Sequence, residues 1–393
     1  MLTGALEVTD RRTEIIRIVE EGFEMKIVLT YDPRWGYTPE DHISCWESLD
    51  TVEYVAGLLG ETGNTVLPVK ADDAFEFRLK EIMSKHAEPL VFWLNEFMPT
   101  DSGKKLTAGR PFTVSVIEKV GMMHTGPGSE ALGIGLDKEI TKDVFRRLGL
   151  PTPESYVVYP GDHSPIYQQG HWDGYVIIKP LLHGDSIGID EFSVVYADDF
   201  GSIRERVERI HHEFDEPVLV ERYIGEEGTR EFTVPMLISH DGRVAELPIT
   251  EIDLSRIAVA QGRFRFLTHA IKDEEYNLKI PAELPPEIIR RIHSDVGRII
   301  KEIGCRDMTR VDMRDDSTGL YYIEVNVDPG KSRFSSYLTA SAYSLGLDYP
   351  GIIAFIPYQA MLRYGLEPPR ELEELVKPVM ALFDTGQAVA VNP

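Results

Sequence analysis

Apolar and polar positions alternate in blocks along the first part of the chain. The segment MKIVLTYD, which opens at Met25, has the pattern of a buried β-strand, and NTVLPV and PLVFWLNEF repeat that pattern. Between them, SLDTVEYVAGLLGETG has apolar residues at helical spacing and ends in glycine. Short apolar strands that alternate with amphipathic helices are typical of a parallel sheet covered by helices. We therefore predict an α/β domain over residues 25–125, preceded by a short amphipathic helix in residues 1–24.

The pattern changes after residue 125. DKEITKDVFRRLGLPTP is predicted to be a helix that ends at Gly149, just before Pro151. YVIIKPLLHGDSIGI indicates a strand, a glycine-containing loop and a second strand, while DDFGSIRERVERIHHEF indicates a helix and EPVLVERYI a strand. This mixture predicts a smaller central domain over residues 126–230.

Two hairpins and several helices are predicted for residues 231–393. EFTVPMLISHDGRVAELPITEI is expected to turn at Asp241 and Gly242, a pair that favours tight hairpin turns. A long helix follows in PPEIIRRIHSDVGRIIKEIG, then a hairpin in TRVDMRDDSTGLYYIEVNVDPG, then a largely helical end. The predicted fold class is therefore α/β with mixed α+β character, in three domains.

The second of these hairpins carries the strongest chemical signal. Its even positions are polar, with Arg310, Asp312 and Arg314 in the first strand and Glu324 and Asn326 in the second. Side chains alternate faces along a strand, so each polar set shares one side of the sheet. One interpretation is a solvated face. The other is a divalent-cation site, because facing carboxylates repel and Mg²⁺ prefers oxygen ligands.

Two lysines and an acidic segment are further candidates. Lys142 lies on a predicted helix, and Lys179 ends an apolar strand just before a glycine-containing loop, whose N–H groups are suited to cradling phosphates. Each lysine read singly is also consistent with a solvated cation. The segment PVLVERYIGEEGTREF, residues 217–232, fits either a nucleotide-binding hinge or a charged linker.

Composition narrows the class of protein. The 393 residues carry 41 lysines and arginines against 65 aspartates and glutamates, a net charge of −24 that disfavours nucleic acids and anionic membranes as partners. No apolar run approaches the roughly 20 residues that span a bilayer, and the first 24 residues lack the features of a secretion signal. The only cysteines, Cys45 and Cys305, have no metal-binding spacing and fit a reducing cytoplasm.

In their order along the chain, these segments resemble the ATP-grasp superfamily, and within it the D-alanine–D-alanine ligase-like carboxylate–amine ligases. The resemblance is strongest over residues 125–345, in VIIKPLLHGDSIGI, VLVERYIGEEGTREFTVPML and RVDMR…YYIEVNVDPG. It implies an ATP-grasp architecture with the nucleotide site between the central and C-terminal domains. The reaction it implies is phosphoryl transfer from ATP to a carboxylate, followed by attack of an amine on the acyl phosphate to form an amide.

The resemblance also implies a role for each matching position. Lys142 and Lys179 would contact the phosphates of ATP. Asp312, Glu324 and Asn326 would hold two Mg²⁺ ions, or Mn²⁺ in their place. The residues that would read the base and the ribose are Glu221, the backbone of Arg222, Tyr223 and Ile224, and Glu231. The residues expected at the reacting groups are Arg310, Gly330, Ser186 and, near the acyl phosphate, Lys272.

The departures from the family pattern fall mostly on the substrate side. The Gly-Gly-x-Ser-x-Glu signature is replaced by YDPRWGYTPEDHIS, in which Glu40 is a candidate to bind an amino group. Arg265, Lys331 and Ser332 are further substrate candidates, and the two cations suggest a second anionic group on a substrate. We therefore expect a dipeptide or peptide-like product from amino-acid-like substrates.

Three alternatives stay open: an authentic D-alanine–D-alanine ligase, a nucleotide-binding module without turnover, and a small-molecule kinase. Similar enzymes are often dimers, so a homodimer also stays open.

Overall fold

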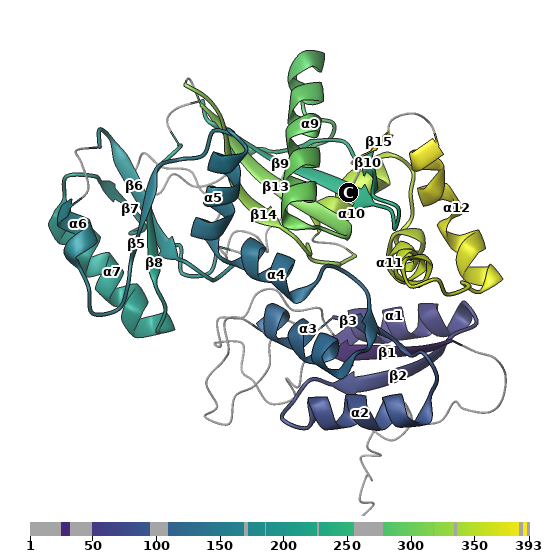
Figure 1. The fold of residues 1–393 in the computed structure, drawn as a ribbon. Helices are drawn as coiled ribbons and strands as arrows, with labels where there is room; N and C mark the ends of the chain where they lie inside the picture. Colours follow the sequence, from purple (N-terminus) through teal and green to yellow (C-terminus); the bar gives the residue numbers. More distant parts are fainter. Residues whose placement is uncertain are drawn as a thin grey trace, which may run out of the picture.

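The computed structural model of the protein describes residues 25–31, 49–94, 109–168, 172–184, 186–225, 228–254, 278–316, 318–333, 336–384 and 388–390. These residues form three sheets with helices packed against them (Figure 1). The helix predicted in residues 1–24 lies outside them.

The first sheet is parallel, as predicted, with strand order β2-β1-β3-β4. The central strands β1 and β3 are largely buried because helices cover the sheet, whereas β2 at its edge is only partly buried. The elements of this region are β1 (Lys26–Tyr31), α1 (Leu49–Glu61), β2 (Thr65–Lys70), α2 (Phe75–Lys85), β3 (Leu90–Trp93), α3 (Gly109–Val120) and β4 (Met123–His124).

The second sheet is antiparallel, with order β5-β8-β6-β7. The elements here are α4 (Ser129–Leu136), α5 (Lys138–Arg147), β5 (Ser155–Val158), α6 (Ser164–Gln168), β6 (Tyr175–Pro180), β7 (Val194–Tyr196), α7 (Phe200–Phe214) and β8 (Val218–Arg222). The strand predicted within SIGI is wrong. Ser186 and Gly188 have φ of 60° and 72°, so this segment forms consecutive turns and the strand begins only at Val194.

The third sheet contains both predicted hairpins. Strands β9 and β10 pair antiparallel, as do β13 and β14, and β13 also pairs with β9. The elements are β9 (Arg230–Ile238), β10 (Arg243–Glu246), β11 (Thr250–Ile252), β12 (Leu278–Lys279), α9 (Pro286–Ile303), β13 (Asp307–Asp316), β14 (Gly319–Asn326), α10 (Tyr337–Ser344), α11 (Tyr349–Arg363), α12 (Arg370–Asp384) and β15 (Ala388–Ala390). Within the described residues, no helix combines the length and apolar character needed to span a membrane.

Helix α5 fixes the geometry between the second and third sheets (Figure 1). It begins at Lys138 because the Asp137 side chain caps it, accepting hydrogen bonds from two backbone N–H groups of the first turn. Val144 and Phe145 on its apolar face are buried in the core of the third sheet, where the Phe145 ring lies 5.7 Å from that of Tyr322. Lys138 and Lys142 of the same helix reach the second sheet, where Lys138 Nζ donates to the Leu181 carbonyl at 3.1 Å and Lys142 Nζ lies 2.6 Å from the Glu221 carboxylate.

Candidate functional site: a charged cleft between two sheets

A cleft lies between the second and third sheets, with β6, β8 and the loop after β6 on one side and β13 and β14 on the other. The predicted site residues that line it are Lys179, Ser186, Glu221, Tyr223, Ile224, Glu231, Arg310, Asp312 and Glu324. Those that are described but do not line it are Lys142, Arg222, Asn326, Gly330, Lys331 and Ser332. Glu40, Arg265 and Lys272 lie outside the described residues.

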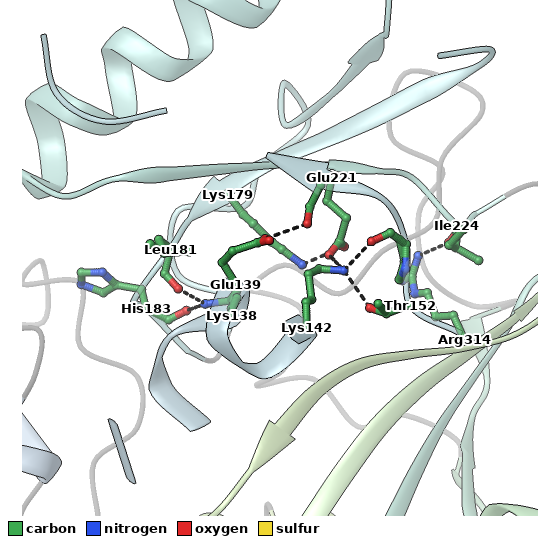
Figure 2. Close-up of polar contacts among 12 residues, drawn as sticks. Lys138, Glu139, Lys142, Thr152, Lys179, Leu181, His183, Glu221, Ile224 and Arg314 are labelled. Atoms are coloured by element: carbon green, nitrogen blue, oxygen red, sulfur yellow. Dashed lines mark hydrogen bonds and ion pairs between the residues drawn. The ribbon is translucent and has the colours of Figure 1, made fainter. Parts of the chain in front are cut away.

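Glu221 joins the two predicted phosphate lysines (Figure 2). Its carboxylate accepts from Lys179 Nζ at 3.0 Å and lies 2.6 Å from Lys142 Nζ, and all three side chains are buried. Burial by itself would raise the pKa of the Glu221 carboxyl, but the two ammonium groups outweigh it and lower the pKa to about 2. Glu221 therefore acts as the shared counterion of both lysines.

Lys138, which we did not predict, occupies the cleft position expected for Lys142. Lys142 is fully buried behind the cleft and donates to Thr152 Oγ1 at 3.0 Å and the Pro153 carbonyl at 2.9 Å. Lys138 lines the cleft and donates to the carbonyls of Leu181 and His183 (Figure 2). Burial lowers the pKa of Lys138, opposed by the nearby Glu324 carboxylate. The geometry thus favours Lys138 over Lys142 as a ligand-facing cation.

The loop after β6 forms two consecutive turns. The Ile187 N–H donates to the Gly184 carbonyl and the Ile189 N–H to the Ser186 carbonyl, each at 3.1 Å. Ser186 and Gly188 adopt positive φ, and a Cβ at Gly188 would lie 2.5 Å from a Pro180 side-chain atom. Only glycine fits this close approach, which brings the loop onto the end of β6 beside Lys179.

The carboxylates of the second hairpin face one another, as the alternation predicts. Asp312 pairs with Glu324 and Arg310 with Asn326 in the β13–β14 register. The Asp312 carboxylate accepts from Arg310 Nε and Nη2 and from Asn326 Nδ2, all at 3.0 Å, and from Thr233 Oγ1 at 2.7 Å. Burial raises the pKa of Asp312; Arg310 opposes this rise and Glu324 adds to it. Arg310 is thus the direct counterion of Asp312, and Lys138 is a nearby cation for Glu324.

This donor set fits a hard divalent cation. It offers two carboxylates and an amide oxygen on adjacent strands, and Mg²⁺ commonly takes one or two carboxylates and completes its shell with phosphates and water. Within the described residues, no group of three or more histidine, cysteine, aspartate or glutamate side chains is placed to hold a metal ion. Asp312, Glu324 and Asn326 could supply only part of a Mg²⁺ shell, which phosphate oxygens and water commonly complete.

The segment after β8 is tied to the third sheet by Arg314, another residue without a predicted role. Arg314 Nη1 donates to the Ile224 carbonyl at 2.7 Å, and its Nη2 donates to Glu231 Oε2 at 2.7 Å. The N–H groups of Arg222 and Tyr223 donate within the second sheet, to the carbonyls of Glu154 and Tyr175. The prediction that this segment binds a nucleotide base therefore depends on backbone groups other than these two N–H groups and the Ile224 carbonyl.

The loop after β14 is held by its own charges. Lys331 Nζ lies 2.6 Å from Asp328 Oδ2 and 5.2 Å from the centroid of the Trp93 ring. The Lys331 carbonyl accepts from the Tyr349 hydroxyl at 2.6 Å, and the Ser332 carbonyl accepts from Thr339. These contacts give Lys331 a structural role in the loop that carries Gly330, and they do not favour it as the reader of a substrate anion.

The residues that we missed gave only faint signals. Lys138 directly follows a capping aspartate, and Arg314 continues the polar alternation of Arg310 and Asp312. Tyr337, which also lines the cleft and lies under the Arg310 guanidinium at 5.1 Å, follows a segment without periodicity. These side chains differ from solvated ones only in where the fold places them, and a single sequence does not show that placement.

Comparisons with known proteins identify the family of the chain. The family model described as D-ala D-ala ligase C-terminus matches residues 144–356, more than half of the chain. The D-alanine–D-alanine ligase of Mycobacterium avium is 29% identical over 249 residues, which are 63% of this chain and 65% of that relative. The chain thus spans less than two thirds of that relative's length.

The solved structures extend the fold resemblance beyond the family match. The D-alanine–D-alanine ligase from Bacillus anthracis has a TM-score of 0.62 and 22% identity, and the alignment covers 87% of this chain and 99% of that one. The structure described as that ligase complexed with ATP gives a TM-score of 0.61 with 21% identity over the same shares of both chains. At this identity the likeness establishes the shared fold.

Proposed function

This chain belongs to the D-ala D-ala ligase C-terminus family, and from that premise we propose that it is an ATP-dependent carboxylate–amine ligase. The observation that carries the proposal is the composition of the cleft. Lys138 from α5 and Lys179 from β6 line it, as do the facing carboxylates Asp312 and Glu324 from the third sheet. Cations opposite a carboxylate pair are what a metal-bound triphosphate requires. The Bacillus anthracis relative with ATP supports ATP as the nucleotide.

The proposed reaction has two steps. A substrate carboxylate oxygen attacks the γ-phosphorus of ATP, the bond to the β-phosphate oxygen breaks, and ADP leaves. The amine of a second substrate then attacks the acyl carbon, loses a proton, and expels inorganic phosphate as the amide forms. The protein's task in both steps is to position the reactants and stabilise developing charge.

We assign roles to this chain's residues as follows. Lys138, Lys179 and the backbone of the loop that carries Ser186 bind the phosphates, while Lys142 sits behind them with Glu221. Mg²⁺ held by Asp312, Glu324 and Asn326, two ions in the family pattern, would neutralise charge on the transferring phosphoryl group. We propose that the backbone of Arg222–Ile224 contacts the base and that the Glu231 carboxylate contacts the ribose.

Arg310 is proposed to stabilise the oxyanion of the second step. Its guanidinium lines the cleft, lies over the Tyr337 ring and is held in place by Asp312. A preorganised cation of this kind stabilises negative charge without having to reorient during the reaction. Gly330 is proposed to contribute its backbone N–H, and Lys272 to act near the acyl phosphate. Glu40, Arg265 and Ser332 stay predictions for substrate binding.

A substrate panel tests the proposal. The protein is incubated with Mg·ATP and pairs drawn from D- and L-amino acids, small peptides and amines, phosphate release is measured, and products are identified by mass spectrometry. We expect release that depends on a specific pair, with a product whose mass is that of both substrates less one water. D-alanine is the first substrate to test, because the named relatives are D-alanine–D-alanine ligases.

The variant Glu324→Ala tests the metal assignment. We expect it to reduce turnover by more than the roughly 10–100-fold that loss of a metal's outer-shell partner costs, with an unchanged circular dichroism spectrum. Near-normal turnover in this variant would refute the metal assignment. A stable phosphorylated product would instead identify a kinase, and tight Mg·ATP binding without turnover on the whole panel would identify a nucleotide-binding module.

A further inference from the structure

One arginine contacts both segments that are proposed to read the nucleoside. Arg314 on β13 lies directly opposite Glu231 on β9 in the strand register. Its Nε and Nη2 donate to Glu231 Oε2 at 3.1 and 2.7 Å, and its Nη1 donates to the Ile224 carbonyl at 2.7 Å. Figure 2 shows the guanidinium beside Ile224. All three residues line the cleft.

The ion pair is too sheltered to be treated as a surface salt bridge. The side chains of Arg314 and Glu231 are only 12% and 16% exposed, and the guanidinium lies 5.7 Å from the centroid of the Tyr223 ring. Exposed pairs contribute little, whereas removal of one partner from a buried pair leaves an uncompensated charge. Loss of Arg314 would therefore change where the Glu231 carboxylate lies.

The third hydrogen bond separates this arrangement from an ordinary cross-strand pair. An ordinary pair of side chains across β9 and β13 would include only the contact between Arg314 and Glu231. The bond to the Ile224 carbonyl reaches the segment after β8, which belongs to the other wall of the cleft. The rigid fork of a guanidinium can hold both acceptors at a fixed separation, which the single ammonium of lysine cannot do.

We propose that Arg314 is a positioning residue that fixes the Glu231 carboxylate relative to the Ile224 backbone, and so sets selectivity for a nucleoside triphosphate with an intact ribose. This inference rests on the proposed function. Both bonds from the guanidinium to Glu231 use Oε2, so Oε1 keeps its capacity to accept from ribose hydroxyls. The guanidinium also offsets the carboxylate charge, which would otherwise repel an anionic nucleotide.

Calorimetric titration with ATP and with 2′,3′-dideoxy-ATP, both with Mg²⁺, tests the inference. We expect the natural protein to bind ATP about 10-fold more tightly or better, because a hydrogen bond to a charged acceptor is lost with the hydroxyls. In Arg314→Met the Kd for ATP should rise about 10-fold, and the preference over the dideoxy analogue should fall below about 3-fold. In turnover assays KM for ATP should rise while kcat changes little.

Two further variants distinguish positioning from a general loss of structure. Arg314→Lys keeps a positive charge beside Glu231 and should recover part of the ribose preference. Arg204→Met removes an exposed arginine paired with Glu208 on α7 and should bind both nucleotides as the natural protein does. If Arg314→Met does not fold, the result for Arg314→Lys decides the question. An Arg314→Lys variant that prefers ATP over the dideoxy analogue as strongly as the natural protein does would overturn the inference.

The remaining outcomes are equally decisive. A natural preference retained in Arg314→Met, or no preference in the natural protein, would overturn the role of Arg314 and leave the ligase proposal standing. If the natural protein bound neither nucleotide, the proposed function itself would fail, and the inference with it.

Discussion

Glu221 is the residue on which the charges of the second sheet converge. Its pKa is lowered to about 2 from an ordinary value of 4.5, because Lys142 and Lys179 outweigh the effect of burial. A carboxyl with a lowered pKa stabilises the folded state fully above its unfolded pKa and loses that contribution as the pH falls toward its folded pKa. The window of loss therefore runs from about pH 4.5 down to about pH 2.

We predict that Glu221→Gln destabilises the protein at pH 7 by about 3–5 kcal/mol, because two buried ammonium groups lose their counterion. The difference in Tm between the natural protein and the variant should be largest near neutral pH and shrink as the pH falls from 4.5 toward 2. Thermal melts across this range measure it. Glu208→Gln, which removes an exposed carboxylate of α7, is the control and should leave Tm unchanged. A pH-independent difference would contradict the assignment.

At this scale the sequence predicts residue types better than positions. Lys138 and Lys142 are four residues apart on α5, so they share one helix face and have the same pattern in the sequence. Only the packing of α5 beside β6 decides which ammonium reaches the cleft and which is buried against Thr152. Glu221 shows the same limit: the strand pattern predicts its burial, but not that two lysines neutralise it.

Strand β13 is the element that organises the site. It pairs with both β9 and β14, so its side chains meet partners from two strands. The alternation in the sequence predicts the face shared by Arg310, Asp312 and Glu324, since a period of two is intrinsic to a strand. It does not predict the irregularity after Asp312, where the register with β14 shifts and Met313 pairs with Tyr322.

The first residue of β13 anchors this strand to the rest of the molecule. Asp307 is buried and adopts φ of 61°; its carboxylate accepts from the Gly126 N–H at 2.6 Å and from Arg363 Nη1 at 2.8 Å. It thus links β13 to helix α11 and to the segment after β4. Removing it leaves the largely buried guanidinium of Arg363 without this counterion.

We predict that Asp307→Ala destabilises the protein by about 3–5 kcal/mol, as expected when one partner of a buried ion pair is lost. Asp307→Asn should cost less, because asparagine tolerates positive φ and can still accept the Gly126 hydrogen bond. Urea denaturation gives both values. Asp143→Asn, which removes an exposed carboxylate on α5, is the matched control. Equal losses for the alanine and asparagine variants would contradict this expectation, because they would attribute the whole effect to the charge that both substitutions remove.

The whole molecule is held together by contacts between segments distant in sequence. One apolar core joins strands β1 and β3 with helices α11 and α12, so residues near both ends of the described chain share it. The block pattern predicts a parallel sheet at the start and helices at the end. It does not predict that they pack together, because amphipathic faces specify burial and not their partner.

The charge of the whole chain differs from the charge pattern within the cleft. The chain has a net charge of −24, yet Lys138, Lys179, Arg310 and Arg314 all line one cleft. Glu221, Glu231, Asp312 and Glu324 line the same cleft, so its cations are balanced by carboxylates, while the acidic surface as a whole repels polyanions. The overall composition thus disfavours polyanions as partners, and the cations of the cleft indicate where a small anionic ligand would bind.

A ligand that bridges the second and third sheets should stabilise the whole fold, because it binds the folded state and not the unfolded chain. We predict that Mg·ATP at 100 times its Kd raises the free energy of unfolding by about 2.7 kcal/mol. For a protein of this size that corresponds to a rise in Tm of several degrees, measurable by differential scanning fluorimetry. Adenosine, which cannot engage the lysines of the cleft, should raise it less at equal concentration.

The matched variants show whether the stabilisation arises in the cleft. Lys179→Ala removes a cation that lines it and should lose most of the shift with Mg·ATP, whereas Lys377→Ala, on the exposed face of α12, should keep it. The shift should also diminish as salt is added, since phosphate recognition by lysine is electrostatic. An equal shift in both variants would place the nucleotide elsewhere, because a triphosphate bound between the sheets would lie against Lys179, which lines the cleft from β6.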